Sequence, residues 1–462
     1  MKTRPNLRNF FYLVGSGLVV QFAGSIYRIW LARKIGPEGL GILQMIYPVY
    51  RLLSGIATIG LPLALTKWVA EYLAYQQYTK IFLLKNWALR IVFLSSVVIA
   101  AFLYLGTPFL SRNVFTDPRI QESLFIVALA IPFSAISAIF RGYYQGYSLM
   151  APTAASEIAE QIIEITTTCL AVEFFLQILP FSIFGAPVLG LTMGEVTCLT
   201  TLLLFYKYSH KPRVSQFLSE SPNNPELPQR QIFRYSWPIL LNQIVVSISL
   251  ASEGIIIPHL LMSNGLNAAL STGLFGKLTG MAEPVAYFPL LFSAPLGSVL
   301  SPQVSSAFKT KSFQKILRKI SLFYLVTTFF SLLAFCFILF TAAPIAKFLY
   351  QDASPSLLIK ILVVGLPFTG IGILNISILA SVGATKTVMA LSIWAVGLKT
   401  FALIGLIPLW GVVGAAWAIN ITQIFTCLAS MHEVRRLLTP LSASILPKWL
   451  KPFRFPWPHP RR

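Results

Sequence analysis

The sequence predicts an all-α protein that crosses a membrane about twelve times, in two lobes of six helices each. Of its 462 residues, 56% are hydrophobic and only 11% are charged, and the mean hydropathy is +0.72. A soluble domain carries about 25% charged residues. Apolar runs of about 20 residues, the length that spans a bilayer as a helix, recur from one end of the chain to the other. Backbone amides in lipid must form their hydrogen bonds within their own segment, so these spans are expected to be helices.

The expected spans share this length and are bounded by polar segments or by Gly/Pro-rich turns. In chain order they are residues 10–33, 43–66, 87–110, 121–145, 152–176, 183–206, 233–257, 273–300, 317–342, 357–382, 386–408 and 411–433. The eighth span contains Pro284, Pro289 and Pro295, which predict a broken helix of the kind that lines a cavity.

The first two spans are predicted to form a hairpin, because Gly and Pro punctuate the segment Ile35 to Gly41 between them. Arg28 precedes this turn and Arg51 follows it at a similar distance, so the two side chains are expected at a similar depth in the membrane. A buried guanidinium needs an acidic or phosphate partner, and its planar fork suits pyrophosphate. We therefore predict that Arg28 and Arg51 contact a substrate. The alternative is that each pairs with a carboxylate or reaches towards the membrane surface.

The fourth and fifth spans are predicted to form a second hairpin that contains an ion pair and an acidic face. Arg141 and Glu157 lie at equal distances from the turn, which favours a structural ion pair between them. Glu157, Glu160 and Glu164 have the spacing of one helix face. Three carboxylates so close together repel one another, so at least one is expected to hold a proton or bind a cation. With Glu195 in the sixth span they form a candidate ion or proton coupling site. Alternatively, the acidic face simply lines a water-filled cavity.

The polar stretch between the sixth and seventh spans is the expected linker between two halves. Six spans is an even number, so the halves share one topology, as in transporters built from parallel repeats related by a pseudo-two-fold axis along the membrane normal. The predicted domains are a lobe at 1–206, a cytoplasmic linker at 207–231, a second lobe at 232–434 and a basic cytoplasmic tail at 435–462.

The second half contains fewer candidate residues. Glu253 and Lys277 lie at similar distances from a turn near Asn264, which favours an ion pair between them. The role of this pair is either structural or functional. Lys277 and Lys399 are, with the two arginines, candidates for pyrophosphate or sugar binding. The four cysteines fall in predicted spans without metal-ligand spacing, and the four histidines are scattered. Neither a metal site nor a disulfide framework is expected.

The distribution of Lys and Arg predicts the orientation. With both termini in the cytoplasm, only six of them lie in loops on the outer side: Arg33, Lys34, Arg112, Arg119, Lys347 and Lys360. The loops on the other side contain far more, as the positive-inside rule requires. The net charge of +21 is then explained by this topology and by contact with anionic membrane lipids, so no nucleic-acid partner is expected.

Several sequence words resemble a known family. They are Tyr27-Arg28, Leu31-Ala-Arg33, Ile35-Gly-Pro-Glu-Gly-Leu-Gly41, Gln44-Met45, Tyr47-Pro-Val-Tyr50, Gly60-Leu-Pro62, Lys67 with Val69-Ala-Glu71, Arg141-Gly-Tyr143, Gln145-Gly146, Pro152-Thr-Ala154 and Leu278-Thr-Gly-Met-Ala282. On these residues the chain resembles the stage V sporulation protein B group of polysaccharide-biosynthesis membrane proteins. That group lies within the superfamily of multidrug/oligosaccharidyl-lipid/polysaccharide flippases.

The resemblance implies a MATE-like fold and a flippase for lipid-linked sugar in the bacterial cytoplasmic membrane. The leading cargo is an undecaprenyl-pyrophosphate sugar, namely a peptidoglycan or spore-cortex precursor, and cell-wall synthesis proteins are further candidate partners. Two departures stand out. Glu164 occupies a position where the group leads us to expect an arginine, and the chain is shorter than the larger members. Its length favours a sporulation paralogue.

No nucleophile–base pair, phosphate-binding glycine loop or metal triad is evident, so we expect neither an enzyme nor a catalytic site. Coupling to Na⁺ or H⁺ is the only cofactor-like requirement expected. Three functions compete: a flippase working by alternating access, a cation-coupled multidrug antiporter, and a non-transporting scaffold for wall synthesis. A pyrophosphate lipid needs cations and a cationic drug needs acids, so Arg28, Arg51, Lys277 and Lys399 favour the flippase.

Overall fold

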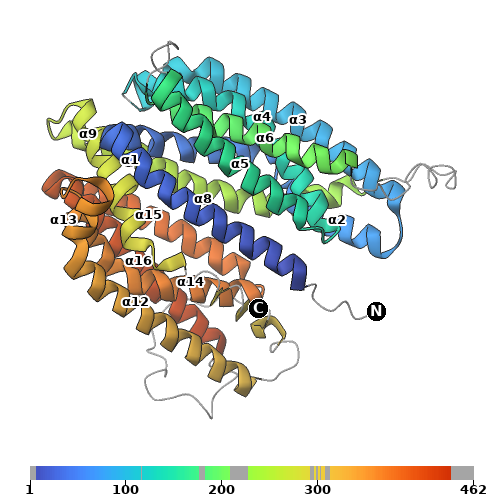
Figure 1. The fold of residues 1–462 in the computed structure, drawn as a ribbon. Coiled ribbons are helices and arrows are strands. Elements are labelled where there is room, and N and C mark those ends of the chain that lie inside the picture. Colours follow the sequence, from blue (N-terminus) through green and yellow to red (C-terminus); the bar gives the residue numbers. More distant parts are fainter. Residues whose placement is uncertain are drawn as a thin grey trace. The chain divides into compact units, whose positions relative to one another are not determined.

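The computed structural model describes residues 7–115, 117–175, 183–208, 227–291, 296, 297, 300, 301, 303–306 and 313–438. Within these ranges the chain forms helices and no strand, as predicted (Figure 1). The α-helices are α1 (Leu7–Thr58), α2 (Leu61–Ala74), α3 (Tyr78–Phe109), α4 (Ile120–Gly146), α5 (Ala151–Leu170), α6 (Ala186–Tyr208), α8 (Gln229–Ser263), α9 (Ala268–Phe275), α10 (Glu283–Tyr287), α12 (Phe313–Tyr350), α13 (Ser356–Leu362), α14 (Leu366–Ser381), α15 (Thr385–Trp410) and α16 (Val412–Leu438). Three π-helical segments, η1 (Leu110–Val114), η2 (Ala171–Phe175) and η3 (Gly276–Ala282), and one 3-10 turn, η4 (Val363–Gly365), complete the set.

Nine of the described helical stretches are long and apolar enough to cross a membrane. The difference from the twelve expected spans arises at three places. The first and second spans are joined in α1, the fifth contains three glutamates that make α5 too polar, and the eighth is broken into α9, η3 and α10. The broken eighth span was predicted from its prolines. Of these, Pro284 and Pro289 are described, and Pro295 lies outside the described residues.

The predicted hairpin turn is a kink at Gly36, within a helix that is otherwise continuous. Gly36 has φ 68° and ψ −176°, a conformation that residues with a Cβ avoid. The chain reverses here, as two sets of contacts show. Before the kink, contacts with α5 advance along both helices together, from Tyr27 with Thr168 to Lys34 with Glu173. Beyond the kink the chain continues into α2, whose contacts with α4, the antiparallel neighbour of α5, advance together from Pro62 with Gly142 to Val69 with Gly146.

The chain divides into two compact units, residues 1–280 and 281–462. The first unit includes α8 and α9, because α8 packs along the second half of α1. Glycines at this contact bring the helices close together: a Cβ added at Gly55 would lie 2.6 Å from the Gln243 side chain, and one at Gly60 would lie 2.6 Å from the Ser236 carbonyl oxygen. The boundary predicted from the repeat, at 207–231, stays a prediction. Residues 209–226 of that linker and 439–462 of the predicted tail lie outside the described residues.

The second unit has its own apolar core between α12, α14 and α16. Leu300, Ile316, Ile320, Leu374, Ile378 and Val434 are among its buried members. Asn375 is buried in the same region, where its amide donates to the Ser430 hydroxyl at 2.9 Å and its carbonyl accepts from Tyr324. This satisfies a polar side chain that would otherwise be costly in an apolar interior.

Candidate functional site

A polar cluster lies inside the first unit, on α1, α4, α5 and α6. Its foundation is the close packing of α5 on α6. A Cβ at Gly190 would lie 2.6 Å from the Glu164 carbonyl oxygen, and one at Gly194 would lie 3.1 Å from that of Glu160. Because the backbone of α6 comes so near to the turns of α5 that contain the glutamates, Glu195 is placed beside them. Glu195 interacts electrostatically with Glu160, and the predicted coupling role of these acids stays a prediction.

The ion pair of α4 is made with a different glutamate from the one predicted. Arg141 Nη2 lies 2.5 Å from Glu160 Oε2 and 2.9 Å from Cys198 Sγ. Arg141 also interacts electrostatically with Glu157 and Glu195, but Glu157 is not its direct partner. The predicted pair of Arg141 with Glu157 is thus corrected to Arg141 with Glu160.

The tilt of side chains along a helix explains this correction. Each Cα–Cβ bond points towards the N-terminus of its own helix. The N-terminus of α4 lies away from the turn and that of α5 lies at the turn, so Arg141 leans away from the turn while the glutamates of α5 lean towards it. Residues whose Cα atoms are level therefore miss each other, and the arginine meets the glutamate one turn further along, Glu160.

The remaining acids have hydroxyl partners. Glu195 is buried and accepts hydrogen bonds from Tyr50 of α1 and Ser134 of α4. Glu157 is hydrogen-bonded to Ser16, also on α1. These hydroxyl residues, and Cys198, were missed as site residues. Tyr50 could have been found from its position in an apolar helix, because the hydroxyl of a buried tyrosine needs a hydrogen-bond partner.

Arg28 and Arg51 lie close to this acidic cluster. Both interact electrostatically with the hydroxyl of Tyr47, which lies between them in the sequence. Arg28 also interacts with Glu164, and neither guanidinium is buried. The similar depth expected for the two arginines is consistent with their common neighbour. Arg28, Arg51 and Glu164 therefore lie in the same region of the first unit, around Tyr47, and their roles in substrate binding and coupling stay predictions.

Three potential ligands for a metal ion lie together in the network. The ligand atoms of Glu160, Glu195 and Cys198 all fall within 4.8 Å of one another. Arg141 contacts both Glu160 and Cys198, so a divalent ion would compete with a guanidinium already in place. Among the described residues this group therefore suits a proton or a weakly held monovalent cation better than a structural metal.

The other candidate residues lie on α8, η3 and α15. Glu253 is buried on α8, and Lys277 is half-buried in η3. Their predicted ion pair stays a prediction. Lys399 is half-buried on α15 and belongs to the second unit.

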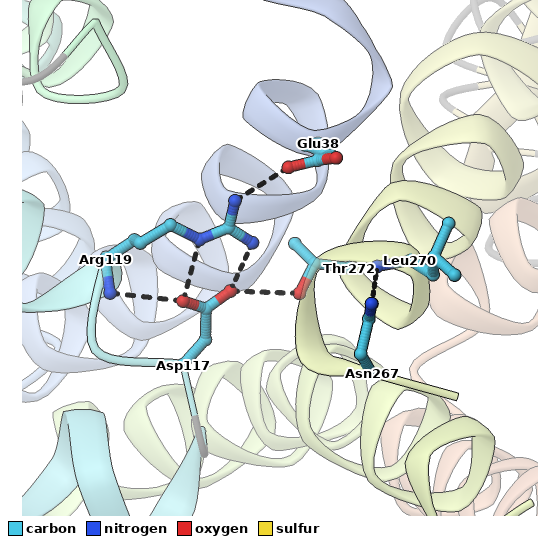
Figure 2. Close-up of polar contacts among 6 residues, drawn as sticks. All are labelled: Glu38, Asp117, Arg119, Asn267, Leu270 and Thr272. Carbon is cyan, nitrogen blue, oxygen red and sulfur yellow. Dashed lines mark hydrogen bonds and ion pairs between the residues drawn. The ribbon is translucent and has the colours of Figure 1, made fainter. Parts of the chain in front are cut away.

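A second polar network lies at the kink of α1 (Figure 2). Arg119 holds Asp117 through two side-chain hydrogen bonds, at 3.0 and 2.8 Å, and contacts Glu38 at 2.7 Å. Asp117 is almost fully buried and also accepts a hydrogen bond of 3.2 Å from Thr272 of α9. Burial raises the pKa of the Asp117 carboxyl, but the hydrogen bonds and charge of Arg119 outweigh it and leave the pKa below its ordinary value. Sequence reasoning placed Glu38 in the turn but found no role for Asp117.

Comparisons with known proteins agree with this architecture. The family model described as polysaccharide biosynthesis protein matches residues 6–308. Stage V sporulation protein B of Bacillus subtilis (strain 168) is 27% identical over 317 residues, which cover 68% of this chain but only 61% of that protein. Lipid II flippase MurJ of the same organism is 22% identical over 453 residues, covering 93% of this chain and 82% of that protein.

Solved structures show the same fold. An inward-facing multidrug resistance MATE family transporter of the MOP superfamily matches with a TM-score of 0.73 at 13% identity, covering 95% of this chain and all of that chain. An identity so low carries information on the fold alone. The family model, in contrast, matches well over half of the chain and confirms the resemblance found in the sequence. The chain therefore belongs to the polysaccharide biosynthesis protein family, and it is a multi-pass membrane protein with the twelve-helix fold of the MATE and MurJ transporters of the MOP superfamily.

Proposed function

We propose that this chain is a flippase that moves a lipid-linked oligosaccharide across the bacterial cytoplasmic membrane by alternating access. The cargo is an undecaprenyl-pyrophosphate sugar, a precursor of peptidoglycan or of the spore cortex, and both termini lie in the cytoplasm. The observation that supports this proposal is that Arg28 and Arg51, both in the first unit, each interact electrostatically with Tyr47. Two exposed guanidiniums and a tyrosine hydroxyl suit the oxygens of a pyrophosphate.

The proposed coupling of substrate binding to a driving ion follows from the residues around these arginines. Arg28 interacts with Glu164, which in turn interacts with Glu160 and Glu195. A pyrophosphate bound by Arg28 offsets the charge that Arg28 presents to Glu164. Four glutamates then face a cluster with less positive charge, and a proton or sodium ion relieves their repulsion. A membrane potential is worth about 2.3 kcal/mol per charge per 100 mV, which is enough to bias such a cycle without ATP.

The acidic cluster also supports a second candidate function, a cation-coupled multidrug antiporter. Glu160, Glu164 and Glu195 would attract a cationic drug, whereas Arg28 and Arg51 would repel it. The two candidates therefore predict opposite effects of removing the arginines: a flippase loses transport, and an antiporter of cationic drugs gains it.

The test is transport by purified protein in liposomes. Undecaprenyl-pyrophosphate sugars are supplied on one side, and their appearance on the other is measured under imposed pH, sodium and voltage gradients. Arg28→Ala and Arg51→Ala are each expected to lose at least tenfold in rate, since one charge-assisted hydrogen bond contributes about 1.5–3 kcal/mol. Arg90→Ala, which removes an exposed arginine of α3, is the matched control. Full activity of both alanine variants would refute the contact of the arginines with pyrophosphate. If the wild-type protein transports no lipid-linked sugar, the flippase proposal fails and a non-transporting scaffold for wall synthesis remains as the alternative.

The coupling role is tested with Glu160→Gln and Glu164→Gln. If these glutamates bind the driving ion, the variants transport at a rate that no longer depends on pH or on sodium as the wild type does. A dependence identical to that of the wild type would mean that the glutamates only support the structure.

A further inference from the structure

Aromatic side chains from three helices meet at one end of the first unit. Trp68 of α2 packs edge to face against Tyr235 of α8, with ring centres 5.4 Å apart. Trp87 of α3 packs in the same way against Phe233 of α8, also at 5.4 Å. Edge-to-face pairs of this kind are favourable and fix the relative orientation of their rings. The two rings of α8 are therefore held beside α2 and α3.

The ammonium group of Lys67 lies over two of these rings. Its Nζ atom is 4.6 Å from the centre of the Trp68 ring and 4.3 Å from that of Tyr235, which are cation–π distances. Glu71 lies one helical turn further along α2, at a spacing where a lysine and a glutamate can form an ion pair. Within the described part of the chain, however, Lys67 makes no ion pair, and it is exposed. Its positive charge is thus positioned by the rings but not neutralised by an acid.

Two arginines of α8 add positive charge beside these rings. Arg230 and Arg234 are one helical turn apart, so they share a face of α8, and both are exposed. Arg234 directly precedes Tyr235, and neither arginine makes an ion pair with another described residue. Phe233 and Trp237, which are 39% and 59% exposed, lie on the same side of the helix. The contact of α2 with α8 therefore carries three cations, with exposed apolar rings next to them.

The position of these residues along their helices places them at the membrane surface. Lys67 is the first residue after the predicted second span, 43–66, and Tyr235 is the third residue of the predicted seventh span, 233–257. Both therefore lie where the hydrocarbon of the bilayer gives way to lipid headgroups, and the predicted orientation makes this the inner leaflet. Tyr and Trp are common at this depth, but an aromatic belt alone does not require unpaired cations. Basic clusters next to a span on this side recognise the phosphates of anionic lipids.

We propose that the headgroup of one anionic phospholipid of the inner leaflet binds to Lys67, Trp68, Arg230, Arg234 and Tyr235, which we call the basic–aromatic patch. The phosphate oxygens accept hydrogen bonds from Lys67 and Arg234, and the neighbouring exposed rings of α8 contact the acyl chains. A zwitterionic lipid carries a positive group of its own, which the three cations of the patch repel, so the patch selects lipids by charge. This inference does not depend on the identity of the cargo.

The test measures lipid binding to purified protein in detergent. Phosphatidylglycerol and phosphatidylcholine with the same acyl chains are titrated separately, and native mass spectrometry gives the affinity for the first lipid bound. The wild type is expected to bind phosphatidylglycerol more tightly. Lys67→Met and Arg234→Met are each expected to weaken this binding about fivefold, the contribution of one basic residue near an anionic membrane surface. Lys207→Met is the matched control, because Lys207 is also exposed and lies over a tyrosine ring, that of Tyr208 at 5.4 Å.

The aromatic part of the patch is tested at Tyr235. Tyr235→Phe keeps the ring under the ammonium of Lys67 and is expected to bind phosphatidylglycerol as the wild type does. Tyr235→Leu removes the ring and is expected to weaken binding, because the ammonium is no longer held in place. Thermal unfolding of each variant without added lipid verifies that a loss of binding is not a loss of folding.

Three results would overturn the proposal. Equal losses of affinity for Lys67→Met and Lys207→Met would show that only the overall charge of the protein matters. Equal affinities of the wild type for the two phospholipids would show that the patch does not select an anionic headgroup. Displacement of phosphatidylglycerol by undecaprenyl pyrophosphate at an equal concentration would assign the patch to the proposed cargo instead of to a phospholipid.

Discussion

The pair Arg141–Glu160 permits a quantitative test of how the acidic cluster is held in the membrane. The perturbation is a double-mutant cycle of Arg141→Met, Glu160→Gln and the two together. Arg141→Met keeps a long apolar side chain and removes the charge, and Glu160→Gln keeps the shape of the carboxylate. Each single variant leaves one member of the pair without its partner, and the double variant leaves neither.

The magnitude follows from the geometry and the burial. The two side chains are 27% and 24% exposed and lie 2.5 Å apart, so the pair is mostly buried. Breaking a buried pair by removing one partner costs about 3–5 kcal/mol. The partial exposure places this pair at the lower end, at about 3 kcal/mol for Arg141→Met, which also leaves Glu157 and Glu195 without a shared cation. The double variant is expected to lose about 1 kcal/mol, because no charge is left unpaired.

The assay is equilibrium or thermal unfolding of the purified protein in detergent, with Arg90→Met as the control for loss of an exposed arginine. The expected coupling energy between Arg141 and Glu160 is about 2 kcal/mol. Additive losses in the double variant would show that the two residues do not stabilise each other. A loss below about 1 kcal/mol for Arg141→Met would show that the pair behaves like one on the surface.

Three further predictions concern packing, pH and hydrogen bonding. Gly190→Ala places a Cβ 2.1 Å from Thr168 Oγ1 and should destabilise the protein by about 1–3 kcal/mol in thermal unfolding, whereas Gly106→Ala, with no atom within 4 Å, should not; equal effects would refute the close packing of α5 on α6. Because the pKa of Asp117 is lowered in the native state, its stabilising contribution is present above the ordinary carboxyl pKa and is lost as pH falls through the lowered value. The stability difference between wild type and Asp117→Asn should therefore be constant from neutral to mildly acidic pH and shrink only in strong acid, and a difference that changes near neutrality would contradict it. Tyr50→Phe leaves Glu195 with one hydroxyl partner fewer and should cost about 1–3 kcal/mol, measured against Tyr75→Phe, which removes the hydroxyl of an exposed tyrosine.

The sequence was sufficient for the helical class and for two breaks in the helices, because hydrophobic length and Gly/Pro punctuation act locally. The turn at Ile35 to Gly41 was predicted from composition, and Gly36 is the residue that reverses the chain. The broken eighth span followed in the same way from Pro284 and Pro289. The helical class, the membrane location and the family were likewise predictable, and the comparisons confirm the family.

Partners within the polar cluster were less predictable, because they depend on how neighbouring helices lean and rotate. Counting residues from a turn gave Glu157 as the partner of Arg141, whereas the side chains of the two helices lean in opposite directions and Arg141 meets Glu160. Tyr50 and Cys198 come from helices whose contact with α5 and α4 no linear spacing reveals. Likewise, nothing in the sequence relates Asp117 to Thr272, because 155 residues separate them.

The three π-helical segments of the described chain have a consequence for how its helices can rotate. A π-turn closes its hydrogen bond over one residue more than an α-turn does. Conversion of such a segment to α-helix therefore frees one residue, and the helix beyond it turns by about 100° without losing its ladder of hydrogen bonds. Of these segments, only η3 joins two helices directly, α9 and α10, and it begins at Gly276 against the kink of α1. Its spare residue would let α10 turn relative to α9, and a homologue that lacks it should show a single-residue gap there when its sequence is aligned.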